Sequence, residues 1–228
     1  MDWFIVVAGG HGERMGKTLP KQFIDIGGQP VLIHTIERLH RSMPQAHFVL
    51  VLPVQYQSYW IDICKKYDFR QRMLIADGGE TRFQSVRNGL ALITESANDI
   101  VAVHDGVRPF VDEEVVRKCF ERALQSGAAL PVVQPVESVR FREGEHDSHA
   151  LERARCCLVQ TPQVFRLDWL RRAYTQEYRR EFTDDASVVE SCGYKIDLVE
   201  GNRENIKLTT PADLQWAEVL LEKGYRTK

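Results

Sequence analysis

A glycine-rich segment near the start of the chain combines small residues with basic ones. Residues 8–17 are AGGHGERMGK and residues 19–22 are LPKQ, so Arg14, Lys17 and Lys21 lie close together in the chain. Glycines let backbone N–H groups approach an anion without obstruction by a Cβ, and several cations acting together suit a triphosphate. The segment therefore predicts a nucleotide phosphate site. A glycine turn with solvated basic side chains is the alternative.

Two better-known phosphate motifs do not fit this segment. A dinucleotide fingerprint GxGxxG that starts at Gly10 needs glycine at position 15, where Met15 stands. A Walker A loop that ends at position 18 needs glycine at position 11, where His11 stands, and Pro20 excludes the helix that should begin there. The sequence also lacks the HExxH and GxSxG motifs, which argues against a zinc site of that type and a serine hydrolase.

Two further charged residues stand where a ligand would bind. Asp105 follows an apolar run expected to be a strand, and open α/β sheets bind ligands at such strand ends. Because Mg²⁺ prefers one or two carboxylates plus substrate phosphates, Asp105 is the candidate metal ligand, with a turn-forming aspartate as the alternative. Lys207 lies between Ile206 and Leu208, which we expect to be buried; a solvated surface lysine is its ordinary alternative.

Short apolar runs alternate with longer amphipathic ones along most of the chain, which predicts strands alternating with helices. The expected strands are rich in Val and Ile and cover residues 4–7, 48–52, 73–75, 100–104, 129–133 and 196–199. The expected helices cover residues 31–40, 56–67, 85–92, 113–125, 167–178, 185–192 and 211–221. This alternation predicts an α/β fold, with a Rossmann-like wound, mostly parallel sheet flanked by helices, in a single domain of residues 1–228.

Residues 140–155 interrupt the alternation. Eight of these sixteen residues are charged and two are histidines, which is unlike a core helix or a central strand. A solvated insertion is one interpretation, and an arm that projects toward a partner subunit is the other. We expect a projecting charged arm over residues 136–156, inserted in the domain and lying at a dimer interface.

The composition limits the classes of partner and the compartment. The 228 residues carry 30 basic and 32 acidic side chains, a formal net charge of −2, whereas binding to nucleic acid or to an anionic membrane needs a basic excess. We therefore expect neither partner. The first apolar run is too short for a signal peptide or a membrane span. Five cysteines without CxxC spacing predict free thiols in a reducing cytoplasm.

Six motifs, in order, resemble those of the nucleotidyltransferases that make CDP-alcohols, notably the 2-C-methyl-D-erythritol 4-phosphate cytidylyltransferase family. The first is AGGxGxRMG with PKQ, and the others are DGGETRFQSV at 77–86, HDGVRP at 104–109, TPQ at 161–163, TDDAS at 183–187 and NIKLT at 205–209. They span nearly the whole chain. The resemblance implies a reaction between CTP and 2-C-methyl-D-erythritol 4-phosphate that gives the CDP-alcohol and pyrophosphate.

The resemblance also assigns roles at the nucleotide site. The residues implied to bind the nucleotide are Ala8, Gly9, Gly10, Gly12, Gly79, Glu80 and Ser85, of which the last three would frame the cytosine. The implied catalytic cations are Arg14, Lys21 and Lys207, and Asp105 would hold Mg²⁺. The attacking group is a phosphate monoester that is largely dianionic at pH 7, so this chemistry needs cations rather than a general base.

The implied acceptor site consists of Arg153, Thr183 and Ser138. Arg153 would grip the phosphate of a polyol phosphate and reach across the interface of a homodimer with exchanged arms; the neighbouring Arg155 is its rival. The family usually has Asp-Thr where this chain has Glu137-Ser138, so acceptor identity is the least constrained inference.

Other functions stay open at this point. A ribitol-5-phosphate cytidylyltransferase is the nearest alternative, although Ser85 and the TDDAS motif favour the methylerythritol enzyme. A sugar-1-phosphate nucleotidyltransferase that uses UTP or dTTP is more distant. A module that binds CTP without turnover belongs to a different class, and it would leave the cations without a reaction to serve.

Overall fold

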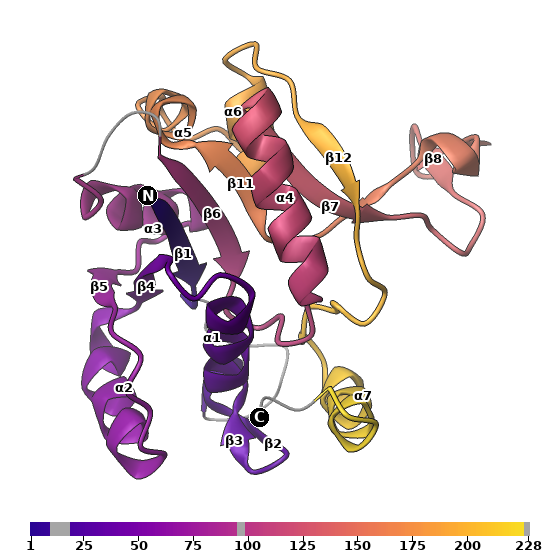
Figure 1. Ribbon diagram of the computed structural model, residues 1–228. Helices are drawn as coiled ribbons and strands as arrows, with labels where there is room; N and C mark the ends of the chain where they lie inside the picture. The colour runs from indigo at the N-terminus through magenta and orange to yellow at the C-terminus, as the bar shows by residue number, and fades with distance from the viewer. Residues whose placement is uncertain (10–18, 95–98, 226–228) are drawn as a thin grey trace.

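The computed structural model describes residues 1–9, 19–94 and 99–225, and an eight-stranded sheet runs through this part of the chain (Figure 1). Its path is β10-β7-β11-β6-β1-β4-β5, and β12 also pairs with β7. The strands are β1 (Asp2–Val7), β4 (His47–Leu52), β5 (Leu74–Asp77), β6 (Ile100–Asp105), β7 (Ala128–Val133), β10 (Leu158–Val159), β11 (Gln163–Arg166) and β12 (Asp197–Glu200).

The centre of the sheet is parallel, and this brings several strand ends to one edge. β1 pairs in parallel with both β4 and β6, in a register that sets Val7 opposite Val51 on one side and Asp105 on the other. β5 continues the parallel order beyond β4, whereas β11 runs antiparallel between β6 and β7. The segments that follow β1, β5 and β6 therefore leave the sheet at the same edge.

Helices cover both faces of the sheet, because side chains along each strand alternate between the faces. Phe4 and Val6 of β1 pack in one cluster with α1 (Val31–Ser42), α2 (Val54–Lys66) and α4 (Glu113–Ser126). Ile5 packs in the other cluster with α3 (Arg82–Ala91), α5 (Leu167–Ala173) and α6 (Asp185–Glu190).

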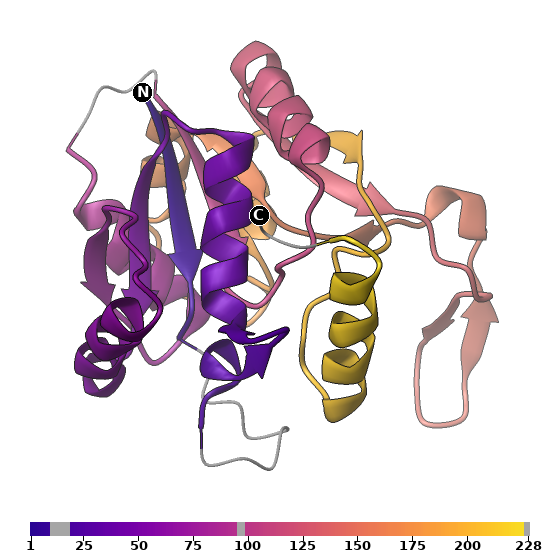
Figure 2. The same ribbon diagram turned by 60° about the horizontal axis from the view of Figure 1, so that its bottom comes forward.

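The last helix, α7 (Pro211–Glu222), lies beside α1 and the small hairpin of β2 (Asp25–Ile26) and β3 (Gln29–Pro30) (Figure 2). Thr210 caps α7 with a capping box, and Pro211 is the first residue of the helix. No helix in the described ranges is long and apolar enough to span a membrane.

The predicted α/β fold is confirmed, and each expected strand and helix is present with end shifts of a few residues. α3 begins at Arg82 rather than Ser85, because Thr81 is its N-cap and forms a capping box with Gln84, the third residue of the helix. α5 ends at Ala173 rather than near Tyr178. The side chain of Gln176 donates to the carbonyl of Ala173, the last residue of the helix. β11 was not expected, since its four residues begin directly after a proline.

The charged insertion forms an arm that projects from the end of β7 (Figure 1). It holds a short antiparallel hairpin of β8 (Arg140–Arg142) and β9 (Ser148–Ala150), followed by the 3-10 turn η3 (Arg153–Arg155). All residues from 140 to 155 are exposed. The projecting charged arm is thus confirmed, while its place at a dimer interface stays a prediction.

Candidate active site

A cavity of about 330 Å³ opens at the edge where the parallel strands end. The end of β1, the turn that carries Lys21, the segment after β5, and Asp105 at the end of β6 contribute to its wall, and Lys207 reaches it from near the C-terminus. Pockets of this size at the carboxyl ends of an open α/β sheet commonly bind small ligands.

The segment between β5 and α3 forms one wall of the cavity. Gly79 donates its N–H to Ser85 Oγ at 3.0 Å, and that hydroxyl donates in turn to the carbonyl of Thr81 at 3.0 Å. A Cβ on Gly79 would lie 2.3 Å from Gln84 Cβ, so only glycine fits at this position. Ser85 therefore fixes the backbone of Gly79 and also lines the cavity, while Glu80 donates its N–H to Gln84 Oε1 at 2.8 Å.

The opposite wall joins the start of the glycine-rich segment to the turn around Lys21. Ala8 donates its N–H to the carbonyl of Val51 at 3.0 Å, which extends the β1–β4 pairing to the cavity. The buried side chain of Gln22 donates to the carbonyl of Ala8 at 2.7 Å. This bond fixes the 3-10 turn η2 (Lys21–Phe23) against Ala8, and the Lys21 side chain lines the cavity beside Gly9.

Asp105 lies among three cations drawn from distant parts of the sequence. Its Oδ2 is 3.1 Å from both Arg108 Nε and Lys207 Nζ, and its Oδ1 is 3.7 Å from Arg82 Nε. Burial alone would raise the pKa of Asp105, but Arg82, Lys207 and Arg108 outweigh burial and hold that pKa well below its usual range. The carboxylate is therefore ionised, and the surrounding charge favours an anionic ligand.

A hydrogen-bonded ring fixes the backbone on which Asp105 stands. Asp105 donates its N–H to Thr161 Oγ1 at 3.1 Å, and that hydroxyl lies 3.2 Å from Nδ1 of the fully buried His104. His104 Nε2 donates to the carbonyl of Arg108 at 3.1 Å, since a carbonyl only accepts. Arg108 also donates to the carbonyl of Asn205 at 2.8 Å, so it ties this loop to the segment that carries Lys207.

The cavity brings together eight of the predicted site residues: Ala8, Gly9, Lys21, Gly79, Glu80, Ser85, Asp105 and Lys207. Leu208 is fully buried as expected, but Ile206 is only partly buried. Gly10, Gly12 and Arg14, together with Lys17, lie outside the described residues.

The predicted acceptor residues lie elsewhere in the chain. Ser138, Arg153 and Thr183 are exposed, and none of them belongs to the described lining of this cavity. Arg153 stands on η3 at the base of the arm, where its Nη1 donates to the carbonyl of Val136 at 2.5 Å. Among the residues that the structure describes, this cavity thus gathers part of the predicted nucleotide site and none of the predicted acceptor site.

Four residues that line the cavity belong to the motifs but have no role assigned from the sequence: Gln22, Thr81, Arg82 and Val107. Arg82 belongs to DGGETRFQSV and lies in the cavity wall, and Gln22 belongs to PKQ and supports Ala8. Gln22 directly follows Lys21, and Arg82 lies between Glu80 and Ser85 in the sequence, but only the fold shows that both contribute to the cavity.

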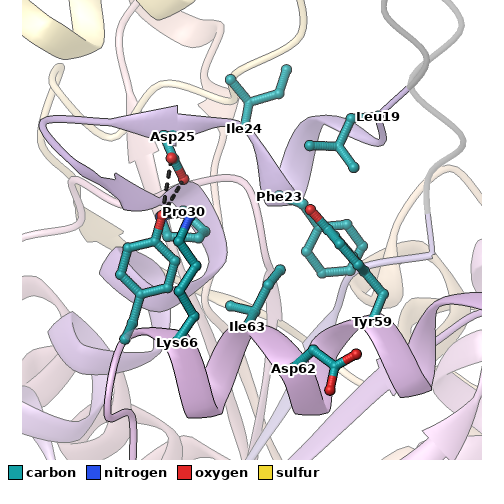
Figure 3. A pocket seen from close by; sticks show the side chains of 10 residues that line it. Leu19, Phe23, Ile24, Asp25, Pro30, Tyr59, Asp62, Ile63 and Lys66 are labelled. Carbon is teal, nitrogen blue, oxygen red and sulfur yellow. Dashed lines mark hydrogen bonds between the residues drawn. The ribbon is translucent and has the colours of Figure 1, made fainter.

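A second cavity of about 440 Å³ lies between the segment 19–30 and α2 (Figure 3). Its lining includes the apolar Phe23 and Ile63, and three of its polar side chains bond one another: Tyr67 donates to Asp25 at 2.9 Å, and Lys66 donates to Tyr67 at 3.0 Å. It therefore presents no cluster of cations for a triphosphate, and we place the phosphate chemistry in the cavity beside Asp105.

A wound α/β sheet with cations gathered at its strand ends defines a nucleotide-binding α/β protein. The sequence profile of the 2-C-methyl-D-erythritol 4-phosphate cytidylyltransferase family matches residues 3–223. The chain belongs to this family.

Individual relatives agree along almost the whole length. The 2-C-methyl-D-erythritol 4-phosphate cytidylyltransferase of Phocaeicola vulgatus is 54% identical over 217 residues, which cover 95% of this chain and 98% of that protein. The one from Porphyromonas gingivalis is 48% identical, covering 95% and 96%. Among solved structures, the Thermus thermophilus cytidylyltransferase of the same name has a TM-score of 0.74 at 30% identity, covering 97% of this chain and all of that one (100%). The 4-diphosphocytidyl-2C-methyl-D-erythritol synthase from Anaerococcus prevotii has a TM-score of 0.83 at 26% identity, covering 97% and 96%.

Proposed function

We propose that this chain transfers the cytidylyl group of CTP to 2-C-methyl-D-erythritol 4-phosphate. The products are 4-diphosphocytidyl-2-C-methyl-D-erythritol and pyrophosphate, in the non-mevalonate route to isoprenoid precursors. Family membership supports this reaction. The observation that carries it in the structure is the convergence of Lys21, Lys207 and Asp105 on one cavity whose wall is the Gly79–Glu80 segment.

The chemistry is a displacement at the α-phosphorus of CTP. An oxygen of the acceptor phosphate forms the new P–O bond, the bond from the α-phosphorus to the bridging oxygen breaks, and pyrophosphate leaves with that electron pair. The acceptor monoester has a second pKa of about 6 and is largely dianionic at pH 7, so it needs no general base. The barrier lies instead in bringing two polyanions together.

Cations of this chain lower that barrier. Lys21 and Lys207 would bind the α-phosphate and neutralise the charge that grows there, and Arg14 would bind the departing pyrophosphate. Preorganised donors of this kind each contribute about 3–4 kcal/mol to transition-state stabilisation. Gly79, Glu80 and Ser85 would present backbone and side-chain groups to the edge of the cytosine. The residues that would surround the phosphates are Ala8, Gly9, Gly10 and Gly12.

Asp105 has the chemistry expected of a residue that holds Mg²⁺. Mg²⁺ commonly uses one protein carboxylate together with substrate phosphates, and no cluster of three or more His, Cys, Asp or Glu suited to a metal occurs in residues 1–9, 19–94 and 99–225. Of its two oxygens, Oδ1 has the longer contact, 3.7 Å to Arg82, and is the better placed for a metal. When bound, the ion would neutralise charge on the triphosphate.

We assign the acceptor site to Ser138, Arg153 and Thr183 across a homodimer with exchanged arms. The exposure of residues 140–155 and the projection of the arm from the domain support this arrangement (Figure 1). Apolar side chains at the arm and at its base are also exposed, among them Val136 at 60% and Phe141 at 54%, and such groups favour burial against a partner.

The five cysteines are free thiols, which supports a reducing cytoplasm as the place of action.

Pyrophosphate release tests the function directly. The protein is incubated with CTP, Mg²⁺ and 2-C-methyl-D-erythritol 4-phosphate, and parallel reactions contain ribitol 5-phosphate, UTP or no acceptor. We expect rapid release only with CTP and the methylerythritol acceptor. Faster release with ribitol 5-phosphate would assign the chain to the alternative acceptor, and CTP binding without any release would make it a nucleotide-binding module.

A further inference from the structure

Arg82 occupies a distinctive place between two carboxylates. Its Nη2 is 2.6 Å from Asp185 Oδ2, whereas its Nε is 3.7 Å from Asp105 Oδ1. The Arg82 side chain is 28% exposed and lines the cavity, while Asp185 is fully buried behind it. The guanidinium is therefore held mainly from the side away from the ligand cavity.

Asp185 is itself held firmly. Its second oxygen, Oδ1, accepts a hydrogen bond of 2.6 Å from the hydroxyl of the buried Tyr174, whose ring stacks on Phe83 at 4.6 Å. Asp185 is the first residue of α6, and Gln163 of β11 bonds both sides of that helix start: it donates to Asp184 at 2.8 Å and accepts from Ala186 N at 2.9 Å. Both oxygens of Asp185 thus have fixed partners in a rigid frame.

The two distances indicate what Asp185 does for Asp105. An arginine beside an unopposed carboxylate closes on it with two short hydrogen bonds. Here the 2.6 Å bond to Asp185 keeps Arg82 at 3.7 Å from Asp105 Oδ1, while Oδ2 is occupied by Arg108 and Lys207. Arg82 therefore stabilises the charge and orientation of Asp105 without forming a short hydrogen bond to Oδ1.

We propose that Arg82 is a positioning residue for the nucleotide site, and that Asp185 and Tyr174 hold its guanidinium at the distance that orients Asp105 while leaving Oδ1 accessible. This inference rests on the proposed function, because it assigns Asp105 to the nucleotide and its metal. Loss of Asp185 lets Arg82 close on Asp105, and loss of Arg82 leaves Asp105 misoriented.

Steady-state kinetics and CTP titration test the proposal on four variants: Asp185→Asn, Tyr174→Phe, Arg82→Gln and Arg82→Lys. Arg87→Gln is the matched control, since Arg87 is an exposed arginine on the same helix. Because hydrogen bonds to charged groups are at stake, we expect Asp185→Asn and Arg82→Gln each to lower kcat/KM for CTP by about tenfold or more, and Tyr174→Phe by about threefold. In the four variants, the KM of the acceptor should stay within about twofold of its value in the starting protein. The kcat/KM of Arg87→Gln for CTP should also stay within about twofold.

A double-mutant cycle separates positioning from a general loss of structure. If Asp185 acts through Arg82, the Arg82→Gln/Asp185→Asn variant should be no worse than Arg82→Gln within about twofold. Arg82→Lys keeps the charge and should retain more CTP affinity, measured by isothermal titration calorimetry, than Arg82→Gln. Multiplying effects in the double variant, or wild-type CTP affinity and kcat in Asp185→Asn, would overturn the proposal.

Two controls keep the outcome decisive. Thermal unfolding shows whether each variant is folded, and if Asp185→Asn is not, the nearly isosteric Tyr174→Phe decides: unchanged CTP binding and turnover in that variant overturn the proposal. If the starting protein binds CTP but releases no pyrophosphate, the proposed reaction fails, whereas the calorimetric comparison of Arg82→Lys with Arg82→Gln still tests the role of Arg82.

Discussion

Lys207 Nζ lies 3.1 Å from Asp105 Oδ2, which couples the last motif of the chain to the end of the central strand β6. The Lys207 side chain is 41% exposed. Lys207 and Lys21 line the same cavity. A lysine in this position can bind a phosphate oxygen while it stays close to the carboxylate that would bind a metal.

The two lysines should dominate turnover. Lys21→Ala and Lys207→Ala each remove a cation expected at the α-phosphate, and we predict that each lowers kcat by roughly a hundredfold or more. Pyrophosphate release at saturating substrates measures the loss. Lys65→Ala, an exposed lysine on α2, is the control and should keep full activity. Near-normal turnover in both active-site variants would remove the proposed mechanism.

Arg153 should act on the acceptor alone. Because an arginine clamps a phosphate with two hydrogen bonds, Arg153→Ala should raise the KM of the acceptor about tenfold or more. CTP affinity, measured by isothermal titration calorimetry, should stay nearly unchanged. Arg155→Ala is the matched control, and the opposite pattern would transfer the role to that residue.

Mixing two impaired variants, assayed at an acceptor concentration below the KM, tests the exchange of arms. If Arg153 completes the site of the partner, a heterodimer of Arg153→Ala and Lys21→Ala protomers contains one intact site and one doubly defective site. We predict that the mixture regains activity above that of either parent after subunit exchange. Suppose the protein is dimeric and subunit exchange between the two variants is complete. A mixture no more active than its parents would then place Arg153 in the site of its own chain.

Gly79 should tolerate no side chain. A Cβ there would lie 2.3 Å from Gln84 Cβ, so Gly79→Ala must displace the segment that lines the cavity. We predict a loss of about 1–3 kcal/mol in the free energy of unfolding and weaker CTP binding. Gly144→Ala, where an added Cβ has no neighbour within 4 Å, should leave the free energy of unfolding unchanged. Equal stability of the two variants in urea would contradict the close packing at Gly79.

Buried His104 should make stability depend on pH. Burial lowers the pKa of His104 to about 4, against about 6.5 in an unfolded chain. The unfolded chain therefore binds this proton first, so the contribution is fully present above pH 6.5 and is lost as the pH falls toward 4. We predict a decrease of about 3 kcal/mol in the free energy of unfolding over this window, measured by urea denaturation. A His104→Gln variant should lack this component, and an unchanged pH dependence in that variant would contradict the assignment.

Periodicity was sufficient to predict the frame of the fold, because parallel strands and amphipathic helices have clear patterns. It could not predict β11, whose four residues follow a proline and run antiparallel, or the hairpin of β8 and β9, whose residues are all exposed. The motifs identified Asp105, but its partners Arg82 and Lys207 come from a helix start and a C-terminal loop. The packing of α3 brings Arg82 to this carboxylate, and Lys207 is brought there by the bond from Leu208 N–H to the carbonyl of Val107 and the bond from Arg108 to the carbonyl of Asn205.

A crystal structure with CTP and Mg²⁺ bound tests the central claim most directly. We predict that the ammonium groups of Lys21 and Lys207 both contact oxygens of the α-phosphate, and that Asp105 stands beside the bound ion. A nucleotide bound in this cavity with either lysine directed away from the α-phosphate, or a nucleotide bound elsewhere on the chain, would contradict the account.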